Sequence, residues 1–202
     1  MAPQLADILQ DSVFRPELVQ RITFRSAPAA LEVVPYNPAW PNLFAASKEQ
    51  MTAALGDIAV AVHHTGSTSV PGLPAKDTID IDLVVRDSTN EAEYVDKLEQ
   101  AGFKFLLREP HWHEHRFFYA YVPHAVNLHV WSPDSPEVER HLIFRQRLLD
   151  CPEDKAMYLK AKQLAASQTR EHNGNLQDYN LLKEDTIRQI LRNAFKELGY
   201  IK

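Results

Sequence analysis

The sequence predicts an α+β fold, in which a mixed β-sheet with flanking helices is followed by a helical C-terminal region. Short β-type runs recur between residues 31 and 132, and two helical segments interrupt them. From Ser135 onward the apolar residues repeat with helical spacing. This order indicates one sheet with helices packed against it, and the C-terminal helices would form one wall of a cleft.

Residues 1–30 are predicted to form a helical N-terminal extension. Apolar residues cluster at Leu5, Ile8 and Leu9, and again after Pro16. The extension could pack on the core of its own subunit or on a partner, and the sequence leaves both arrangements open.

The rest of the chain, 31–202, is long enough for one domain with a substantial core and short for two. Its sheet region is expected at about 31–132, and its helical region at about 135–200. Strands are predicted at 31–38, 58–64, 78–85, 103–108, 114–121 and 126–131. Helices are predicted at 41–56, 90–102, 136–149, 153–168 and 176–198.

Proline and capping residues support these helix boundaries. Pro41, Pro136 and Pro152 stand where first helical positions are expected, because proline has no N–H to lose there. Asn90 followed by Glu93 resembles a capping box.

The composition argues against several classes of function. The net charge of −5 disfavours generic nucleic-acid binding, which requires a basic surface, and no apolar run reaches the length of a membrane span. The first residues lack the features of a targeting peptide, and the single cysteine, Cys151, fits a reducing compartment. We therefore expect a cytoplasmic protein with no nucleic-acid or membrane partner, and a homo-oligomer stays open.

Two carboxylates interrupt an otherwise apolar strand. Asp80 and Asp82 are two residues apart in the run TIDIDLVV, so both side chains point to the same face. Two adjacent carboxylates are costly to bury unless a cation lies between them, and oxygen ligands suit Mg²⁺ or Mn²⁺. The alternative is a strand end that faces solvent.

A loop rich in glycine, serine and proline precedes the acidic strand. Gly66 allows close approach of the backbone to a ligand, and the Ser67 hydroxyl with neighbouring N–H groups can hold phosphate oxygens. Lys76, in the same loop, is a further candidate for phosphate contact. A strand, Gly-Ser, a loop and a strand with Asp-x-Asp together resemble the nucleotidyltransferase fold of the DNA polymerase β superfamily.

The stretch HHTGSTSVPGLPAKDTIDIDLVV resembles the signature of the GrpB family, whose members have a nucleotidyltransferase-like fold. Further segments similar to that family follow in order: VNLHVW, HLIFRQRLLDCPE, the pair Tyr158 and Lys162, and the pair Tyr179 and Lys183. The resemblance covers about residues 31–198 and implies the fold, whereas it names no general substrate.

A third acidic residue is expected on a neighbouring strand of a nucleotidyltransferase, and this chain lacks one there. The candidate strand, 126–131, carries His129 on one face instead. An imidazole can act as metal ligand or general base, so His129 could replace the carboxylate. A hydrogen-bonded structural histidine is the alternative.

Basic residues interrupt the apolar faces of the three C-terminal helices. Arg145, Lys162 and Lys183 each lie in an apolar helical stripe, and Lys183 shares its stripe with Tyr179. A buried cation needs a partner, so these residues could converge on a polyphosphate or on the acidic pair. For each residue alone, a stem lying on apolar surface with its charge in water is at least as good an explanation.

Three histidines alternate in PHWHEHRFF. His111, His113 and His115 would share one face of a strand and could bind zinc, although no spaced motif completes such a site. We expect instead that this segment lines the substrate side of the cleft, with Arg116 available to pair with an acid.

The leading hypothesis is a metal-dependent, nucleotidyltransferase-like enzyme that acts on a nucleoside triphosphate and a small-molecule acceptor. Asp80 and Asp82 would hold the metal, and His129 would orient or deprotonate the acceptor. One alternative is a module that binds a nucleotide or other anion without transfer. Another is a cleft reused for acid–base catalysis without a nucleotide, such as a cyclisation or condensation.

Overall fold

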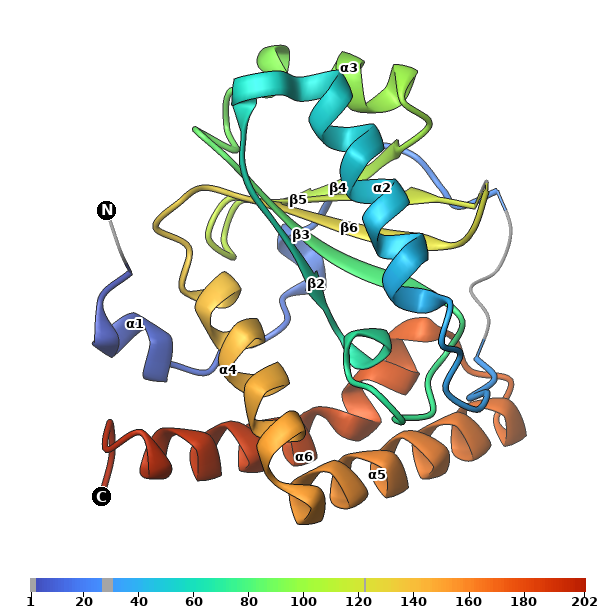
Figure 1. The fold of residues 1–202 in the computed structure, drawn as a ribbon, viewed down its shortest axis with the longest axis vertical. Coiled ribbons are helices and arrows are strands. Elements are labelled where there is room, and N and C mark those ends of the chain that lie inside the picture. Colours follow the sequence, from blue (N-terminus) through green and yellow to red (C-terminus); the bar gives the residue numbers. More distant parts are fainter. Residues whose placement is uncertain (1–2, 27–30, 122) are drawn as a thin grey trace.

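The computed structural model describes residues 3–26, 31–121 and 123–202. Within them, one sheet has the strand order β1-β4-β5-β6-β3-β2 (Figure 1). The strands are β1 (Gln20–Arg21), β2 (Ala59–Thr65), β3 (Ile79–Val85), β4 (Lys104–Glu109), β5 (His115–Ala120) and β6 (Val126–Trp131). The sheet is mixed, because β3 and β6 run parallel while the other neighbouring strands are antiparallel.

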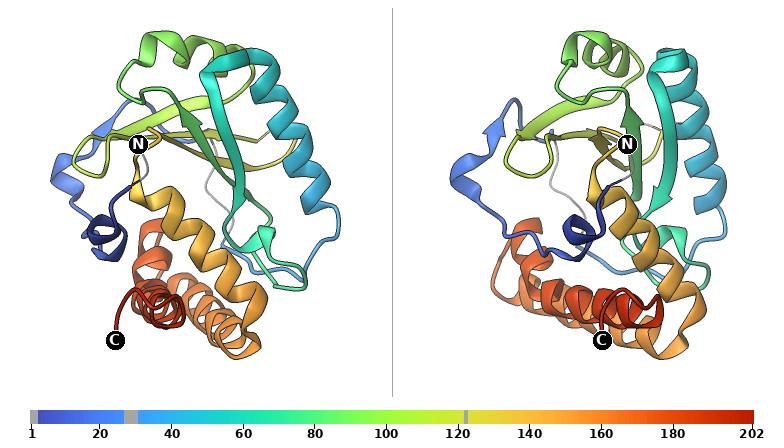
Figure 2. Two further views of the ribbon diagram at one scale, coloured as in Figure 1. Left: turned by 60° about the vertical axis from the view of Figure 1, so that its left-hand side comes forward. Right: turned by 90° about the vertical axis from the view of Figure 1, so that its left-hand side faces the viewer.

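Helices lie on both sides of this sheet. Helix α2 (Trp40–Leu55) crosses one face, with α3 (Val95–Gln100) beside it (Figure 1). Helices α4 (Pro136–Asp150), α5 (Pro152–Glu171) and α6 (Leu176–Glu197) form a separate group, which the views of Figure 2 place below the sheet. None of the helices in the described part of the chain combines the length and apolar character of a membrane span.

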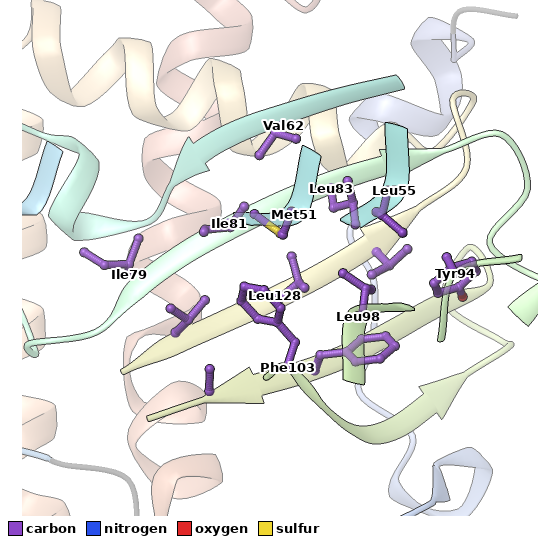
Figure 3. Packing of buried hydrophobic residues seen from close by; sticks show 14 of the residues in the cluster. Met51, Leu55, Val62, Ile79, Ile81, Leu83, Tyr94, Leu98, Phe103 and Leu128 are labelled. Carbon is purple, nitrogen blue, oxygen red and sulfur yellow. The ribbon is translucent and has the colours of Figure 1, made fainter. Parts of the chain in front are cut away.

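The main hydrophobic core lies between the sheet and helices α2 and α3 (Figure 3). Alternate residues of β3 enter it, and Ile81 and Leu83 are fully buried there, as is Leu128 of β6. Full burial of such a side chain contributes about 1.5–3 kcal/mol. Because β3 is fixed by this packing, its remaining residues, including Asp80 and Asp82, must face the opposite side of the sheet.

The strand predicted at 31–38 is wrong. Its only ladder contact is an isolated bridge between Val34 and Ala75. Pro35 and Pro38 cannot donate backbone hydrogen bonds, which disfavours a continuous strand. Leu31 and Val33 pack instead against a buried cluster on α5 and α6.

The prediction of a helical N-terminal extension also needs correction. Residues 3–26 contain the short helix α1 (Leu5–Leu9) and one 3-10 turn, Pro16–Leu18. Beyond them the chain is extended, and β1 pairs with β4 at the edge of the sheet. Residues 27–30, the end of the predicted extension, lie outside the described residues.

Candidate functional site

A cavity of about 450 Å³ lies between the open face of the sheet and helices α4–α6. The strand register explains which side chains reach it. Thr65, Asp80 and Asn127 are aligned across β2, β3 and β6, and Asp82 is aligned with His129 one step further along. The sheet therefore presents a row of polar groups toward the C-terminal helices.

Asp80 lines the cavity and is held at the sheet by a neighbour. Asn127 donates a hydrogen bond from Nδ2 to Asp80 Oδ1 at 2.8 Å, and its own Oδ1 accepts from Arg25 at 2.8 Å. Gly66 lies directly against the carboxylate, because a Cβ built on it would be 2.2 Å from Asp80 Oδ2. With φ at +65°, Gly66 holds a backbone conformation that other residues rarely adopt. The Gly-Ser loop is thus shaped around Asp80, and Ser67 and Thr68 line the cavity next to it.

Asp82 does not line the cavity and is completely buried. Trp131 donates from Nε1 to Asp82 Oδ1 at 3.0 Å, and His141 Nδ1 is 2.8 Å from Asp82 Oδ2. Burial alone would raise the pKa of Asp82, but the charge and hydrogen bond of His141 lower it below its usual value. Burial likewise works against protonation of His141, yet Asp82 raises the pKa of that imidazole to about 9. At neutral pH the two residues form an ion pair.

This ion pair bears on the predicted metal site. A dication between Asp80 and Asp82 would have to reach both carboxylates, whereas Asp82 is completely buried, does not line the cavity and already has its charge balanced by His141. In the described ranges no three His, Cys, Asp or Glu side chains are arranged so that they could hold a metal ion together. The residues present therefore do not fit Mg²⁺ or Mn²⁺ held by this pair.

Three lysines from three segments gather at one end of the cavity. Lys76 and Lys183 both place their Nζ atoms on the ring of Tyr179, at 4.4 Å and 4.7 Å from its centroid. Lys162, 1% exposed, donates to the Pro74 carbonyl at 2.7 Å. These lysines and Tyr179 line the cavity together with Tyr158, whose hydroxyl lies 3.4 Å from Ser67 Oγ.

The lysine cluster is electrostatically costly when empty. Burial, and then repulsion from Lys183, lowers the pKa of Lys76 to about 7. The same two causes lower the pKa of Lys162 to about 7. Asp80 opposes both shifts but does not cancel them. An anion in the cavity would relieve the repulsion, because it would supply the negative charge that one carboxylate does not.

His129 lines the cavity at the end of a buried hydrogen-bond chain. Glu109 Oε2 lies 2.7 Å from His115 Nδ1, and His115 Nε2 lies 2.9 Å from His129 Nδ1. Burial is the main cause that lowers the pKa of both histidines to about 3, so both rings are neutral near pH 7. With Glu109 ionised, this chain places protons on both Nδ1 atoms and leaves a lone pair on His129 Nε2. That lone pair can accept a proton.

The structure does not bring Arg116 and Arg145 to the cavity. Arg116 lies on the opposite face of the sheet, where its Nε donates to Glu91 at 2.7 Å, so the prediction that it lines the substrate side is wrong. Arg145 does not line the cavity, and its charge, after burial, is the second cause that lowers the pKa of His64. Neither arginine is therefore part of the candidate site.

The alternating histidines do not share a strand face. Residues 110–114 form turns, with His113 at a φ of +50°, and β5 begins only at His115. His111 does line the cavity, as does Trp112, whereas His115 is buried in the chain behind His129. The geometry of a zinc-binding strand is therefore not formed.

Sequence reasoning missed several residues of the site, among them Arg25, Asn127 and His141. Arg25 comes from the N-terminal extension, Asn127 was passed over beside His129, and His141 begins a segment noted only for its family resemblance. A usable signal existed for Asn127, which shares a strand face with His129. No local pattern links Arg25 to Asn127 or His141 to Asp82, because these partners are 102 and 59 positions apart.

Comparisons with known proteins agree on one family. The sequence model of the GrpB protein family matches residues 30–193. A UPF0157 protein of Halalkalibacterium halodurans is 40% identical over 167 residues, covering 82% of this chain and 83% of that protein. A UPF0157 protein of Streptomyces coelicolor is 34% identical over 182 residues, covering 89% and 93%.

A structural match and a longer relative complete the comparison. The crystal structure of GrpB from Enterococcus faecalis matches with a TM-score of 0.68 at 24% identity, covering 83% of this chain and 99% of that one. The predicted α+β, nucleotidyltransferase-like fold is thereby confirmed. A dephospho-CoA kinase of Mycolicibacterium paratuberculosis is 28% identical over 233 residues, and 95% of this chain aligns with 56% of that protein.

Proposed function

The chain belongs to the GrpB family. We propose that it binds a nucleoside triphosphate in the cavity and transfers the nucleotidyl group to a small-molecule acceptor, so that the acceptor bonds to the α-phosphorus and pyrophosphate leaves. The convergence of Lys76, Lys162 and Lys183 beside the Gly-Ser loop carries this proposal. At that end of the cavity the three lysines, when protonated, outnumber the one carboxylate that faces them, Asp80. A polyphosphate supplies several anionic oxygens at a spacing that such a cluster can contact.

The acceptor side of the cavity is assigned to His129. When Glu109 is ionised, the hydrogen-bond chain leaves a lone pair on Nε2 of the neutral His129 ring, which can take the proton of an acceptor hydroxyl or amine. The lysines stabilise negative charge on the phosphates as the group is transferred. No step of this proposal passes through a metal, because Asp82 is engaged by His141.

The same engagement of Asp82 favours a second function, in which the nucleotide is bound without transfer. Both functions predict metal-independent binding, and only the first predicts a product. Incubation with each nucleoside triphosphate and a panel of hydroxyl and amine acceptors, followed by mass spectrometry, separates the two.

The first test is thermal unfolding with each nucleoside triphosphate or inorganic tripolyphosphate, in the presence of a chelator and in the presence of Mg²⁺ or Mn²⁺. At about a hundred times the Kd, a ligand should add about 2.7 kcal/mol to the free energy of unfolding, a shift of several degrees. We expect the shift to persist in the chelator. A shift that needs the metal would contradict binding by the lysines alone, and no shift would contradict the proposal.

Lys183→Met is expected to weaken tripolyphosphate binding by about 10- to 100-fold, because it removes one charge-assisted contact of about 1.5–3 kcal/mol. The matched control is Lys196→Met, on the same helix but exposed. Calorimetric titration of both variants measures the effect. Equal affinities for the two variants would show that the anion does not contact Lys183 beside Tyr179.

Binding of a simple anion is expected to weaken as pH rises. The pKa values of Lys76 and Lys162 are lowered to about 7, so both lysines lose their charge in the empty cavity above that pH. Inorganic sulfate keeps its own charge across this range, and its affinity should fall at least about tenfold between about pH 6 and about pH 9. Calorimetry in two buffers should also detect proton uptake on binding near pH 8. Lys162→Met should flatten the pH profile of sulfate affinity. The control is Lys160→Met, an exposed neighbour on the same helix, which should keep the wild-type profile. A flat wild-type profile would contradict the prediction.

A further inference from the structure

An N-terminal strap, residues 8–26, is tied at its beginning to the C-terminal helices. Arg140 on α4 forms an ion pair with Asp11 at 2.9 Å. Arg188 on α6 donates to the carbonyl of Ser12 at 3.1 Å. These contacts fix the strap against the two helices that wall the cavity, and Figure 2 shows the blue chain leaving α1 beside α4.

The other end of the strap is tied to the sheet. Strand β1 pairs with β4, and the Tyr119 hydroxyl donates to the carbonyl of Phe24 at 3.1 Å. Arg25 reaches further, to Asn127, the residue that holds Asp80. The strap therefore spans the cavity from the helices to the sheet, with an anchor on each side.

Between these anchors the strap presents apolar side chains to the cavity. Val13 and Phe14 line it, yet they are 65% and 39% exposed. Trp112, Ile187 and Leu191 line the same cavity from the sheet side and from α6. Val13 and Phe14 are therefore exposed to water beside a pocket. Burying them against an apolar group of a ligand would stabilise the complex.

We propose that Val13 and Phe14 form an apolar subsite, which holds an aromatic or aliphatic group attached to the phosphate that the lysine cluster binds. This inference rests on the proposed function and names the ligand class: phosphate esters or anhydrides that carry a substantial apolar group. The strap precedes residue 30, where the match to the family model begins, so the subsite is an addition to the part of the fold that the family model covers.

The test compares two probes, inorganic phosphate and 1-naphthyl phosphate, which share the anion and differ in the apolar group. In the wild type we expect the naphthyl ester to bind at least about tenfold more tightly, equal to about 1.4 kcal/mol. Val13→Ser combined with Phe14→Ser should reduce this ratio to less than about threefold, and the Kd of inorganic phosphate should stay unchanged.

Two further variants sharpen the comparison. Phe24→Ser is the matched control, because Phe24 is an exposed phenylalanine of the same strap that does not line the cavity. It should keep the full tenfold ratio. Asp11→Asn keeps both apolar side chains but weakens the clamp to Arg140 and Arg188, so it should also lower the ratio.

The outcomes separate the subsite from the proposed function. A naphthyl advantage that is absent in the wild type, or that survives in the Val13 and Phe14 double variant, overturns the subsite while phosphate binding stands. Failure of both probes to bind, or phosphate binding that does not respond to Lys183→Met, overturns the proposed function and with it the subsite.

Discussion

Replacement of Asp82 by alanine is expected to lower the free energy of unfolding by about 3–5 kcal/mol, because it removes one partner of a buried ion pair. Without Asp82, His141 loses the main charge that holds its proton, so the ion pair is lost, and the Trp131 N–H loses its acceptor. For a chain of this size the midpoint of thermal unfolding should fall by roughly 6–20 °C. Denaturant and thermal unfolding measure it, with Asp134→Ala, an exposed aspartate, as control.

The pH dependence of this destabilisation tests its cause. The pKa of His141 is raised in the folded state, so its contribution is complete below the unfolded value of 6.5 and is lost as pH rises through about 9. The pKa of Asp82 is lowered, so its contribution is present above its usual 3.8 and is lost as pH falls through the lower folded value. The stability difference between wild type and Asp82→Ala should therefore be largest near pH 5–6, should shrink as pH rises from about 6.5, and should be small above about pH 9. A difference below about 1 kcal/mol, or one that grows with pH, would contradict the ion pair.

The long C-terminal helices were predictable from the sequence because each shows a sustained apolar period and a clear start. The ranges 136–149, 153–168 and 176–198 compare with Pro136–Asp150, Pro152–Glu171 and Leu176–Glu197. The segment 31–38 resembles a strand because it is apolar, but its apolar side chains are used for packing outside the sheet ladder. Leu31 and Val33 pack on α5 and α6, and Val34 and Tyr36 pack on the main core. Local propensity cannot distinguish these two uses of the same side chains.

The site itself was only partly predictable, for a related physical reason. A lysine in an apolar stripe needs a polar destination, and for Lys162 and Lys183 that destination is the cavity. The same rule predicts that Arg145 and Arg116 need polar surroundings, but it does not predict where these are. Arg145 lies near His64, and Arg116 pairs with Glu91. The sequence predicts that Asp82 is a metal ligand, whereas in the structure it pairs with His141. This pairing was not predictable, because His141 belongs to a helix that only tertiary packing brings to β3.

Gly66→Ala is expected to weaken tripolyphosphate binding by about 100-fold in a protein that remains folded, because small displacements in a preorganised site have large effects. The added methyl group would lie 2.2 Å from Asp80 Oδ2 and 2.8 Å from its Cβ and Cγ, so Asp80 or the loop must move. Backbone strain at a φ of +65° adds a cost of about 1–3 kcal/mol in stability.

Gly72→Ala is the control that separates strain from shape. Gly72 has a φ of +75°, so alanine there suffers comparable strain, yet the nearest atom to its new methyl group is Lys155 Nζ at 3.7 Å. Both variants should therefore lose stability through backbone strain, with a further loss in Gly66→Ala from its clash with Asp80, and only Gly66→Ala should lose binding in calorimetric titration. Equal binding by the two variants would mean that the contact between the Gly-Ser loop and Asp80 shapes the fold and not the anion site. Loss of binding by Gly66→Ala alone would tie anion affinity to that contact, because the two variants share every other effect of the substitution.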